Sequence, residues 1–327
     1  MPTVLIVAGT QVTTSDLHLL YHRAFVAAGW RAVFCSHDHA LPFAEKVIQQ
    51  GRLLFSRAHF ALVNRRVLAV ARRERPDLVF ISGSNWYLWP DTVRALRRLG
   101  ARVVLNEQHL QVLRPYQAES LPLYDHVFTQ DSGLVTPGRT ATLLGPACDP
   151  REHRPLPLTD EERRELGGQV VYLGYGYPNR IAMMEALLEF DVRLWGIGWD
   201  ASPLLRARFR AEPVHGLKKT RIYGASAVSL NLQSEHYQAD GLTCRPFEVA
   251  ASGGFCLTEL RRDLPRYFVP GEEMIAFTDA DDLKRKVAYY LAHPDERNEV
   301  AARGRARALR EHTYDHRVRQ VLDVLGF

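Results

Sequence analysis

The chain has 327 residues, of which 46% are hydrophobic and 24% are charged. These values are ordinary for a globular protein, and at roughly 150 residues per domain they predict two domains. No apolar run approaches the ~20 residues that span a bilayer. The opening residues, MPTVLIVAGT, predict a first strand and not a signal peptide.

The net charge of +5 lies in the first half of the chain. Residues 1–160 hold 18 Lys and Arg against 13 Asp and Glu, whereas residues 161–327 hold 24 against 24. Part of the excess falls on one face of an expected helix, at Arg65, Arg66, Arg72 and Arg73. Such a face favours either a polyanionic partner, such as nucleic acid, or a solvated helix surface.

The sequence predicts neither disulfides nor a metal site. The four cysteines show no CxxC spacing and are Cys35, Cys148, Cys244 and Cys256. Reduced thiols in a cytoplasmic protein are the simplest expectation. The histidine pairs His18–His22 and His37–His39 lack a third ligand at a suitable spacing, so we expect no metal ligands.

Short apolar strands alternate with amphipathic helices through the first half. Strands are expected at Val4–Ala8, Ala32–Ser36, Leu78–Ser82, Val103–Asn106 and His126–Thr129. Helices are expected at Ser15–Ala28, Arg52–Arg75 and Pro90–Leu99. This alternation predicts a parallel, doubly wound sheet.

The same alternation restarts after a proline-rich stretch between Pro146 and Pro157, which is typical of an interdomain linker. Strands are expected at Val170–Leu173, Val192–Trp195, Val228–Leu232 and Phe255–Thr258. Helices are expected at Arg180–Glu189, Lys218–Ala225, Arg245–Ala251, Asp281–Ala292 and Asp295–Leu325, the last broken near His312. The fold class is therefore α/β, with two Rossmann-like doubly wound domains at 1–160 and 161–311.

Polar side chains at the ends of the first four expected strands mark candidate ligand contacts, because doubly wound sheets bind ligands there. Glu107 and His109 follow the fourth strand, and His37 follows the second. These three are the candidate bases.

A glycine turn follows the first strand of the second half. Gly174 and Gly176 would let backbone N–H groups approach a phosphate, and Arg180 would neutralise it. Asn179 breaks the G-x-G-x-x-G pattern, which counts against a nicotinamide dehydrogenase. A plain strand–turn–helix connection explains the same residues.

The segment from Asp240 to Gly254 carries the most chemistry. Its expected helix begins at Arg245 and places Glu248 on the same face. The helix N-terminus and the Arg245 cation suit a diphosphate, and the Glu248 carboxylate suits the two hydroxyls of a ribose. The alternative is a structural Arg245–Glu248 ion pair. A Lys218–Lys219 pair, opening the preceding helix, could reach a phosphate or lie in solvent.

These motifs, in their order and spacing, resemble group 1 glycosyltransferases of the GT-B fold. The resemblance begins with the stretch from Arg245 to Glu259. It continues through Phe268–Phe277, Asp281–Leu283, His293–Arg297 and Glu311–Arg317. The ending around His312 is similar to the branch related to the spore maturation protein CgeB.

The resemblance implies two α/β domains facing a central cleft, with residues 312–327 packing back on the first domain. It implies that Glu248 binds the nucleotide ribose and that Arg180 and Lys218 or Lys219 lie near the diphosphate. Asp240 occupies the position of a second acidic residue that is more often Glu, which leaves retaining and inverting chemistry open, with retention slightly favoured.

The implied activity is metal-independent transfer of a sugar, favouring a hexosyl group from a UDP-sugar. Arg180, Arg245 and the helix end near Thr243 would stabilise the leaving diphosphate. The acceptor stays open between a glycan, a small molecule, a lipid head group and a nucleic acid. A sugar-nucleotide epimerase of the same fold and a catalytically silent nucleotide-sugar-binding protein remain alternatives.

Overall fold

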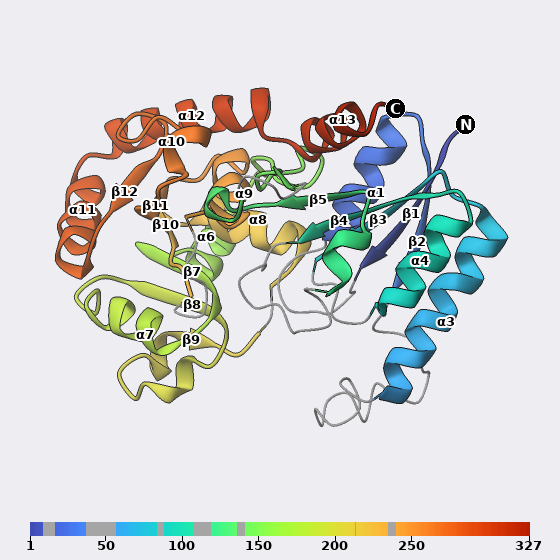
Figure 1. The fold of residues 1–327 in the computed structure, drawn as a ribbon. Coiled ribbons are helices and arrows are strands. Elements are labelled where there is room, and N and C mark those ends of the chain that lie inside the picture. Colours follow the sequence, from blue (N-terminus) through green and yellow to red (C-terminus); the bar gives the residue numbers. More distant parts are fainter. Residues whose placement is uncertain are drawn as a thin grey trace. The chain divides into compact units, whose positions relative to one another are not determined.

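The computed structural model describes residues 1–8, 17–36, 57–83, 88–107, 119–135, 141–212, 214–234 and 240–327. These residues form two compact units. The first comprises those up to Leu144 together with Arg317–Phe327, and the second those from Gly145 to His316. Each unit is built on one parallel sheet covered by helices, which confirms the predicted α/β fold class (Figure 1).

The first unit holds a six-stranded parallel sheet with the strand order β2-β1-β3-β4-β5-β6. Its strands are β1 (Thr3–Ala8), β2 (Arg31–Ser36), β3 (Leu78–Ser82), β4 (Arg102–Glu107), β5 (His126–Thr129) and β6 (Ala141–Leu143). Its connecting helices are α1 (Leu17–Ala27), α3 (Arg57–Glu74) and α4 (Pro90–Arg98). Every residue of β1 and β3 is buried, as expected for central parallel strands.

The second unit holds another six-stranded parallel sheet, with the order β12-β11-β10-β7-β8-β9. Its strands are β7 (Val170–Tyr175), β8 (Val192–Ile197), β9 (Phe209–Arg210), β10 (Val228–Asn231), β11 (Cys256–Glu259) and β12 (Ile275–Phe277). Its helices are α6 (Asp160–Leu166), α7 (Pro178–Glu185), α8 (Gly216–Ala225), α9 (Arg245–Ala251), α10 (Leu264–Tyr267), α11 (Ala280–Ala292) and α12 (Pro294–Glu311). The order reverses between β7 and β10, which defines the switch point of this sheet.

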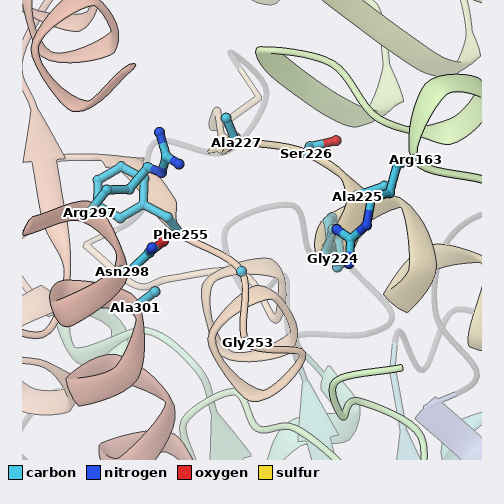
Figure 2. A pocket seen from close by; sticks show the side chains of 12 residues that line it. Arg163, Gly224, Ala225, Ser226, Ala227, Gly253, Phe255, Arg297, Asn298 and Ala301 are labelled. Carbon is cyan, nitrogen blue, oxygen red and sulfur yellow. The ribbon is translucent and has the colours of Figure 1, made fainter. Parts of the chain in front are cut away.

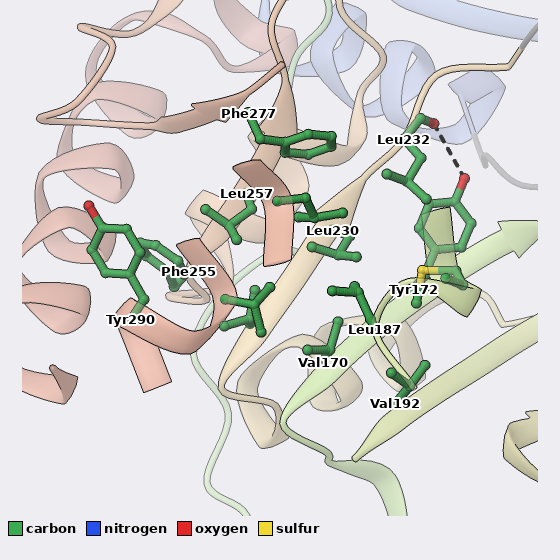
Figure 3. Packing of buried hydrophobic residues seen from close by; sticks show 14 of the residues in the cluster. Val170, Tyr172, Leu187, Val192, Leu230, Leu232, Phe255, Leu257, Phe277 and Tyr290 are labelled. Atoms are coloured by element: carbon green, nitrogen blue, oxygen red, sulfur yellow. Dashed lines mark hydrogen bonds between the residues drawn. The ribbon is translucent and has the colours of Figure 1, made fainter. Parts of the chain in front are cut away.

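The alternation of side chains along β7 explains why helices cover both faces of the second sheet. Val170 and Tyr172 enter one hydrophobic cluster, with residues of α7 and α11 (Figure 3). Val171 and Leu173 enter another, with residues of α8 and α9. Because neighbouring residues of a strand point to opposite faces, one apolar strand supplies both cores.

The last helix, α13 (Tyr314–Leu325), brings the chain end into the first unit. The Phe327 ring lies edge-on to Trp30 with centroids 5.0 Å apart, and a guanidinium N–H of Arg102 donates to the carbonyl of Leu325. Gln320 donates to the carbonyl of Leu143 at 2.9 Å. These contacts fall within Arg317–Phe327, a narrower stretch than the expected 312–327.

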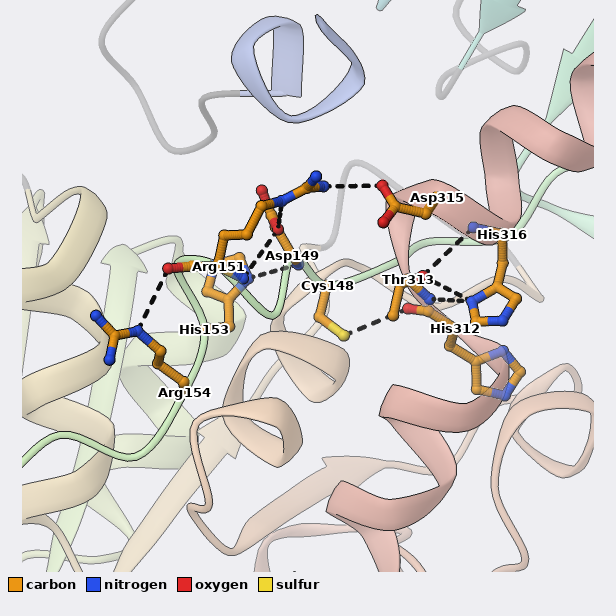
Figure 4. Close-up of polar contacts among 9 residues, drawn as sticks. All are labelled: Cys148, Asp149, Arg151, His153, Arg154, His312, Thr313, Asp315 and His316. Carbon is orange, nitrogen blue, oxygen red and sulfur yellow. Dashed lines mark hydrogen bonds and ion pairs between the residues drawn. The ribbon is translucent and has the colours of Figure 1, made fainter. Parts of the chain in front are cut away.

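The stretch expected to be a linker is largely buried structure of the second unit (Figure 4). Cys148 donates its N–H to the carbonyl of His312 at 2.9 Å and accepts from the N–H of Tyr314 at 3.0 Å. Arg151 pairs with Asp149 at 2.6 Å and with Asp315 at 2.8 Å. Residue 148 therefore pairs with residues 312 and 314 inside the second unit. The division between the units falls after Leu144, whereas the sequence predicted it after residue 160.

The elements that the sequence pattern missed are short. Strands β6, β9 and β12 have three, two and three residues, too few to show a period. Helix α6 has seven residues but a full capping box, in which Thr159 and Glu162 satisfy each other's backbone N–H groups. The expected start of the first helix, Ser15, lies outside the described residues.

Gly304 tests how tightly α12 packs in the second unit. A Cβ there would lie 2.3 Å from the carbonyl oxygen of Glu273, so Gly304→Ala should lower the free energy of unfolding by about 1–3 kcal/mol through overpacking. Gly224, in α8, is the matched control, because its Cβ would meet only a Leu158 methyl at 3.6 Å. Gly224→Ala should be neutral or stabilising by about 0.5–1 kcal/mol. Equal urea midpoints for the two variants would contradict this packing.

Candidate functional site

Charged side chains gather in the second unit at the carboxyl ends of β7 and β10, where the strand order reverses. Helix α7 follows β7 and carries Arg180, and helix α9 follows β10 and carries Arg245 and Glu248. Doubly wound sheets bind ligands at such a switch point. Two segments were expected to bind the nucleotide: the glycine turn with Arg180, and the stretch from Asp240 to Gly254, here called the donor-site motif. Both therefore lie on elements that meet at one edge of one sheet.

Arg245 joins the ends of the two strands. Its guanidinium donates to the carbonyl of Leu173 in β7 at 2.7 Å and to Oδ1 of Asn231 in β10 at 2.9 Å. It also lies over the ring of Tyr172, 4.6 Å from the centroid. Neutral acceptors and an aromatic face fix this cation in place.

Arg180 lies beside the same tyrosine. Its guanidinium donates to the carbonyls of Tyr175 at 3.1 Å and Gln233 at 3.3 Å. It lies 4.9 Å from the ring centroid of Tyr177 and 5.4 Å from that of Tyr172. The residue is only 7% exposed, and burial lowers the pKa of its guanidinium.

Two guanidinium groups thus share the Tyr172 ring without a counter-charge in contact. Among the described residues, no carboxylate forms an ion pair with either Arg180 or Arg245, and their recorded acceptors are neutral. Buried charges are ordinarily paired. Charged groups left uncompensated at a switch point are the pattern expected of an anion-binding site.

Glu248 is buried in α9 and pairs with a lysine of α8. Its Oε1 lies 2.8 Å from Nζ of Lys219 and 3.9 Å from Nε2 of His153. Burial opposes ionisation of this carboxyl, but the Lys219 cation holds its pKa below the ordinary value. Within the described part of the chain there is no Arg245–Glu248 ion pair, so that alternative explanation of the motif does not hold.

The structure gives the two glycines after β7 other contacts than the expected ones to phosphate. The N–H of Gly176 donates to the carbonyl of Ile197 at 2.9 Å, so it is not available to a phosphate. Gly174, with φ +145°, accepts from the indole N–H of Trp199 at 2.9 Å. A Cβ on Gly176 would lie 2.8 Å from the carbonyl oxygen of Gly198. These glycines allow β7 and β8 to approach closely.

Asn179 supports the loop after β10. Its amide donates to the carbonyl of Gln233 at 2.9 Å, the same oxygen that accepts from Arg180. Its Oδ1 is buried and has no partner among the described residues. Asn179 therefore stands beside the guanidinium pair with one acceptor unused.

Lys218 is not part of this cluster. Its Nζ lies 2.5 Å from Oε1 of Glu212, on the exposed surface, and 5.1 Å from the ring centroid of Trp195. Lys219, the next residue, points to Glu248. The phosphate role expected of Lys218 stays a prediction, and in this structure its charge is paired with a nearby carboxylate.

Two of the three expected catalytic residues are described, and they belong to different units. Asp240 is half-buried, and its carboxylate lies 3.5 Å from Nη1 of Arg262. Glu107 is fully buried at the end of β4, in the other unit. His109 lies outside the described residues, as does His37.

The sequence pattern does not indicate the residues that contact Arg180, Arg245 and Glu248. His153 was assigned to a linker, and Asn231 and Tyr172 were counted only as strand residues. The stretch from Cys148 to His153 is mostly charged or polar in a proline-rich context, and it has no periodic pattern that would distinguish a buried loop from an exposed one. Lys219 could have been preferred to Lys218, because it lies four residues before the apolar Tyr223 on the buried helix face.

A separate cavity of about 350 Å³ lies at the opposite end of the second sheet (Figure 2). It is lined by Ala225–Ala227, just before β10, and by Gly253–Phe255, just before β11. Arg163 and Arg297 lie on either side of it. Helices α8 and α9 end here, and the partial negative charge of helix C-termini disfavours anions.

The described thiols and metal-ligating side chains add no further chemistry. The four cysteines are free, and burial raises the pKa of Cys244 to about 11 and that of Cys256 to about 12, which keeps both protonated. The described residues contain no group of three or more metal-ligating side chains. No described helix is long and apolar enough to cross a membrane.

Comparison with solved structures identifies the fold class. A sucrose-phosphate synthase from Thermosynechococcus elongatus is similar with a TM-score of 0.69 at 12% identity, covering 99% of this chain and 98% of that one. Anabaena HepE in complex with UDP and glucose gives a TM-score of 0.69 at 11% identity and covers all of both chains. The protein therefore has the GT-B fold of glycosyltransferases.

Sequence comparison shows similarity to one family model and one curated protein. A family model described as glycosyl transferase-like matches residues 180–323. The spore protein CgeB of Bacillus subtilis (strain 168) is 27% identical over 187 residues, which are 49% of this chain and 57% of CgeB. The match thus spans little more than half of that relative. These findings confirm the predicted resemblance to group 1 glycosyltransferases of the CgeB-related branch.

The neighbouring lysines provide a test of the buried pair. Lys219→Met leaves the Glu248 carboxylate buried without its cation, so it should lower the free energy of unfolding by about 3–5 kcal/mol. Lys218→Met removes only an exposed pair and should cost about 0–1 kcal/mol. Urea denaturation measures both.

The double variant Lys219→Met with Glu248→Gln is the control, because it removes both charges and should recover part of the loss.

The sign of the pH dependence follows from the lowered pKa of Glu248. The stabilisation by this carboxylate is present above its unfolded-state pKa and is lost as the pH falls through its folded-state pKa. Equal destabilisation by the two single substitutions would contradict the assignment.

Proposed function

We propose that this protein is a glycosyltransferase that takes its sugar from a nucleoside diphosphate sugar bound at the switch point of the second unit. The observation that carries the proposal is the pair of guanidinium groups, Arg180 and Arg245, held at the Tyr172 ring without a carboxylate among the described residues. A diphosphate supplies the missing negative charge. The glycosyl transferase-like segment, residues 180–323, includes both arginines.

In this proposal the cations act on the leaving group. Transfer of the sugar breaks the bond to the diphosphate and leaves negative charge on its oxygens. Preorganised guanidinium groups in a buried site stabilise such charge as it develops. Helix α9 has only seven residues, so the guanidinium groups, and not the helix end near Thr243, carry this part of the proposal.

Glu248 is proposed to bind the ribose. It follows Arg245 by three residues in α9, and its Oε1 is held by Lys219. No described group donates to Oε2, which leaves that oxygen as an acceptor for ribose hydroxyls. A UDP-sugar is the favoured donor, because the similar fold of HepE was solved with UDP and with UDP-glucose.

Three further residues are proposed to take part in catalysis. Asp240, eight residues before Glu248, is proposed to lie near the transferred sugar, with a retaining hexosyl transfer favoured. Glu107 and His109 are proposed on the acceptor side. No contact in the described residues favours a polyanionic acceptor; Arg73 in the arginine-rich helix α3 pairs with Glu74.

Separate measurements on nucleoside and nucleotide test the two halves of the donor site. Arg180→Gln and Arg245→Gln should each weaken UDP binding by about 1.5–3 kcal/mol, with uridine binding unchanged, because each removes a charge-assisted contact to phosphate. Glu248→Ala should weaken uridine and UDP binding alike, by a similar amount. Isothermal titration calorimetry gives these affinities, preceded by a screen of UDP, GDP, ADP and TDP.

Lys218→Gln is the matched control for the arginine substitutions, because Glu212 already neutralises that lysine. Its UDP affinity should equal that of the unmodified protein. An equal loss in Lys218→Gln, or unchanged affinity in Glu248→Ala, would overturn these assignments. Epimerisation of the donor sugar without any acceptor would identify an epimerase in place of a transferase.

Sugar transfer should proceed without a divalent cation. Two guanidinium groups are available to stabilise the leaving diphosphate, and the described residues hold no cluster of metal ligands. Turnover, or donor hydrolysis if the acceptor is unknown, should be unchanged by EDTA. Loss of turnover in EDTA with recovery in Mg²⁺ or Mn²⁺ would contradict this expectation.

A further inference from the structure

Three elements of the second unit meet at the Glu248 carboxylate. His153 comes from the segment before α6, Lys219 from α8, and Glu248 itself from α9. All three side chains are nearly inaccessible, with exposed fractions of 1%, 9% and 6%. The donor-site motif of the sequence includes only Glu248, and residue 153 lies outside the glycosyl transferase-like segment.

Hydrogen bonding determines which nitrogen of His153 carries the proton. The backbone N–H of Asp149 donates to Nδ1 at 3.0 Å, so Nδ1 is the acceptor. A neutral imidazole with Nδ1 as acceptor carries its proton on Nε2. Burial lowers the pKa of His153, which agrees with the neutral form.

The acceptor that lies near the Nε2–H of His153 is the carboxylate of Glu248. It is buried without a hydrogen-bond partner among the described residues, and Oε1 of Glu248 lies 3.9 Å away. A shift of about 1 Å would bring the two atoms to an ordinary hydrogen-bond distance. Both recorded partners of Glu248 approach Oε1, which leaves Oε2 as the oxygen that faces neither of them.

The surrounding contacts fix His153 against α8 and α9. Thr220, next to Lys219, donates to the carbonyl of Glu152 at 3.2 Å and lies 3.3 Å from Oγ of Ser252, which ends α9. Asp149, whose N–H holds the imidazole, is in turn held by Arg151 at 2.6 Å. These contacts tie the segment that carries His153 to both helices and keep the imidazole beside Glu248.

We propose that His153 is a positioning residue for ribose recognition, which holds Oε1 of Glu248 so that Oε2 accepts from the ribose hydroxyls. This rests on the proposed function, because it assumes a nucleoside diphosphate at Glu248. The substrate class that it selects is the ribonucleoside diphosphate over its 2′,3′-dideoxy counterpart. The positioning of Glu248 depends on the Nε2–H. Nδ1 accepts only from the backbone N–H of Asp149.

Two substitutions separate these roles of the imidazole. Asn at position 153 can present its side-chain oxygen near the place of Nδ1 and keep the Asp149 contact, but it cannot reach Glu248. Gln at the same position can present an N–H near the place of Nε2. The variants are His153→Asn and His153→Gln, with thermal melts to verify that each is folded.

The measurement is the ratio of the dissociation constants of 2′,3′-dideoxy-UDP and UDP. In the unmodified protein we expect a ratio of about 10–150, the worth of hydrogen bonds to a charged group. His153→Asn should reduce that ratio about 2- to 12-fold, with dideoxy-UDP affinity unchanged, and His153→Gln should restore most of it. A purely structural role predicts the reverse order, or equal losses for both nucleotides.

The outcomes distinguish this inference from the proposed function. No binding of UDP, GDP or ADP would overturn both, and UDP binding without a ribose preference would overturn the assignment of Glu248 and the role of His153 with it. A ribose preference that survives in His153→Asn would overturn the positioning role alone. If His153→Asn does not fold, ¹⁵N-histidine spectra of the unmodified protein decide: the Nε2–H signal of His153 should shift with UDP and not with dideoxy-UDP.

Discussion

The guanidinium of Arg245 holds together the carboxyl ends of β7 and β10, donating to a backbone carbonyl of one and to Asn231 of the other. Parallel strands that are neighbours in a sheet but distant in sequence diverge where their connections leave in opposite directions, and this leaves a crevice. The Arg245 cation joins the two strand ends at this point. Tyr172 then supports Arg245 and Arg180 on one ring, so both charges depend on the same packing.

Most of the fold could be predicted from the sequence because its long elements are apolar and periodic. The strands from Val4 to Thr129 and from Val170 to Thr258 lie where the pattern placed them, since central parallel strands are buried on both faces. The short edge strands β9 and β12 could not be predicted. The proline-rich stretch after Leu144 was interpreted as a linker from its composition, yet tertiary contacts make it part of the second unit.

The sequence predicted at which strand ends the site residues lie, but not which side chains contact one another. The positions of Arg180, Arg245 and Glu248 after their strands follow from topology. Which of Lys218 and Lys219 faces the site depends on the rotation of α8, and a one-residue step turns a helix by about 100°. Whether the N–H of Gly176 is free depends on how β7 pairs with β8, which no local pattern encodes.

Charge balance links the buried carboxylate to the pair of guanidinium groups. Glu248 has a cation of its own in Lys219 and therefore does not neutralise Arg245, although the two residues lie on one helix. If Glu248 were paired with Arg245, the carboxylate would neutralise the guanidinium charge. A diphosphate would then have to break that ion pair in order to bind. With the separate lysine, neither guanidinium group has a carboxylate in contact among the described residues, and a buried charge without such a partner favours an anion that can reach it. The same arrangement holds the pKa of Glu248 below its ordinary value while burial lowers that of His153, so in the proposed function one ionised carboxylate is available to neutral hydroxyls and two cations are available to phosphate.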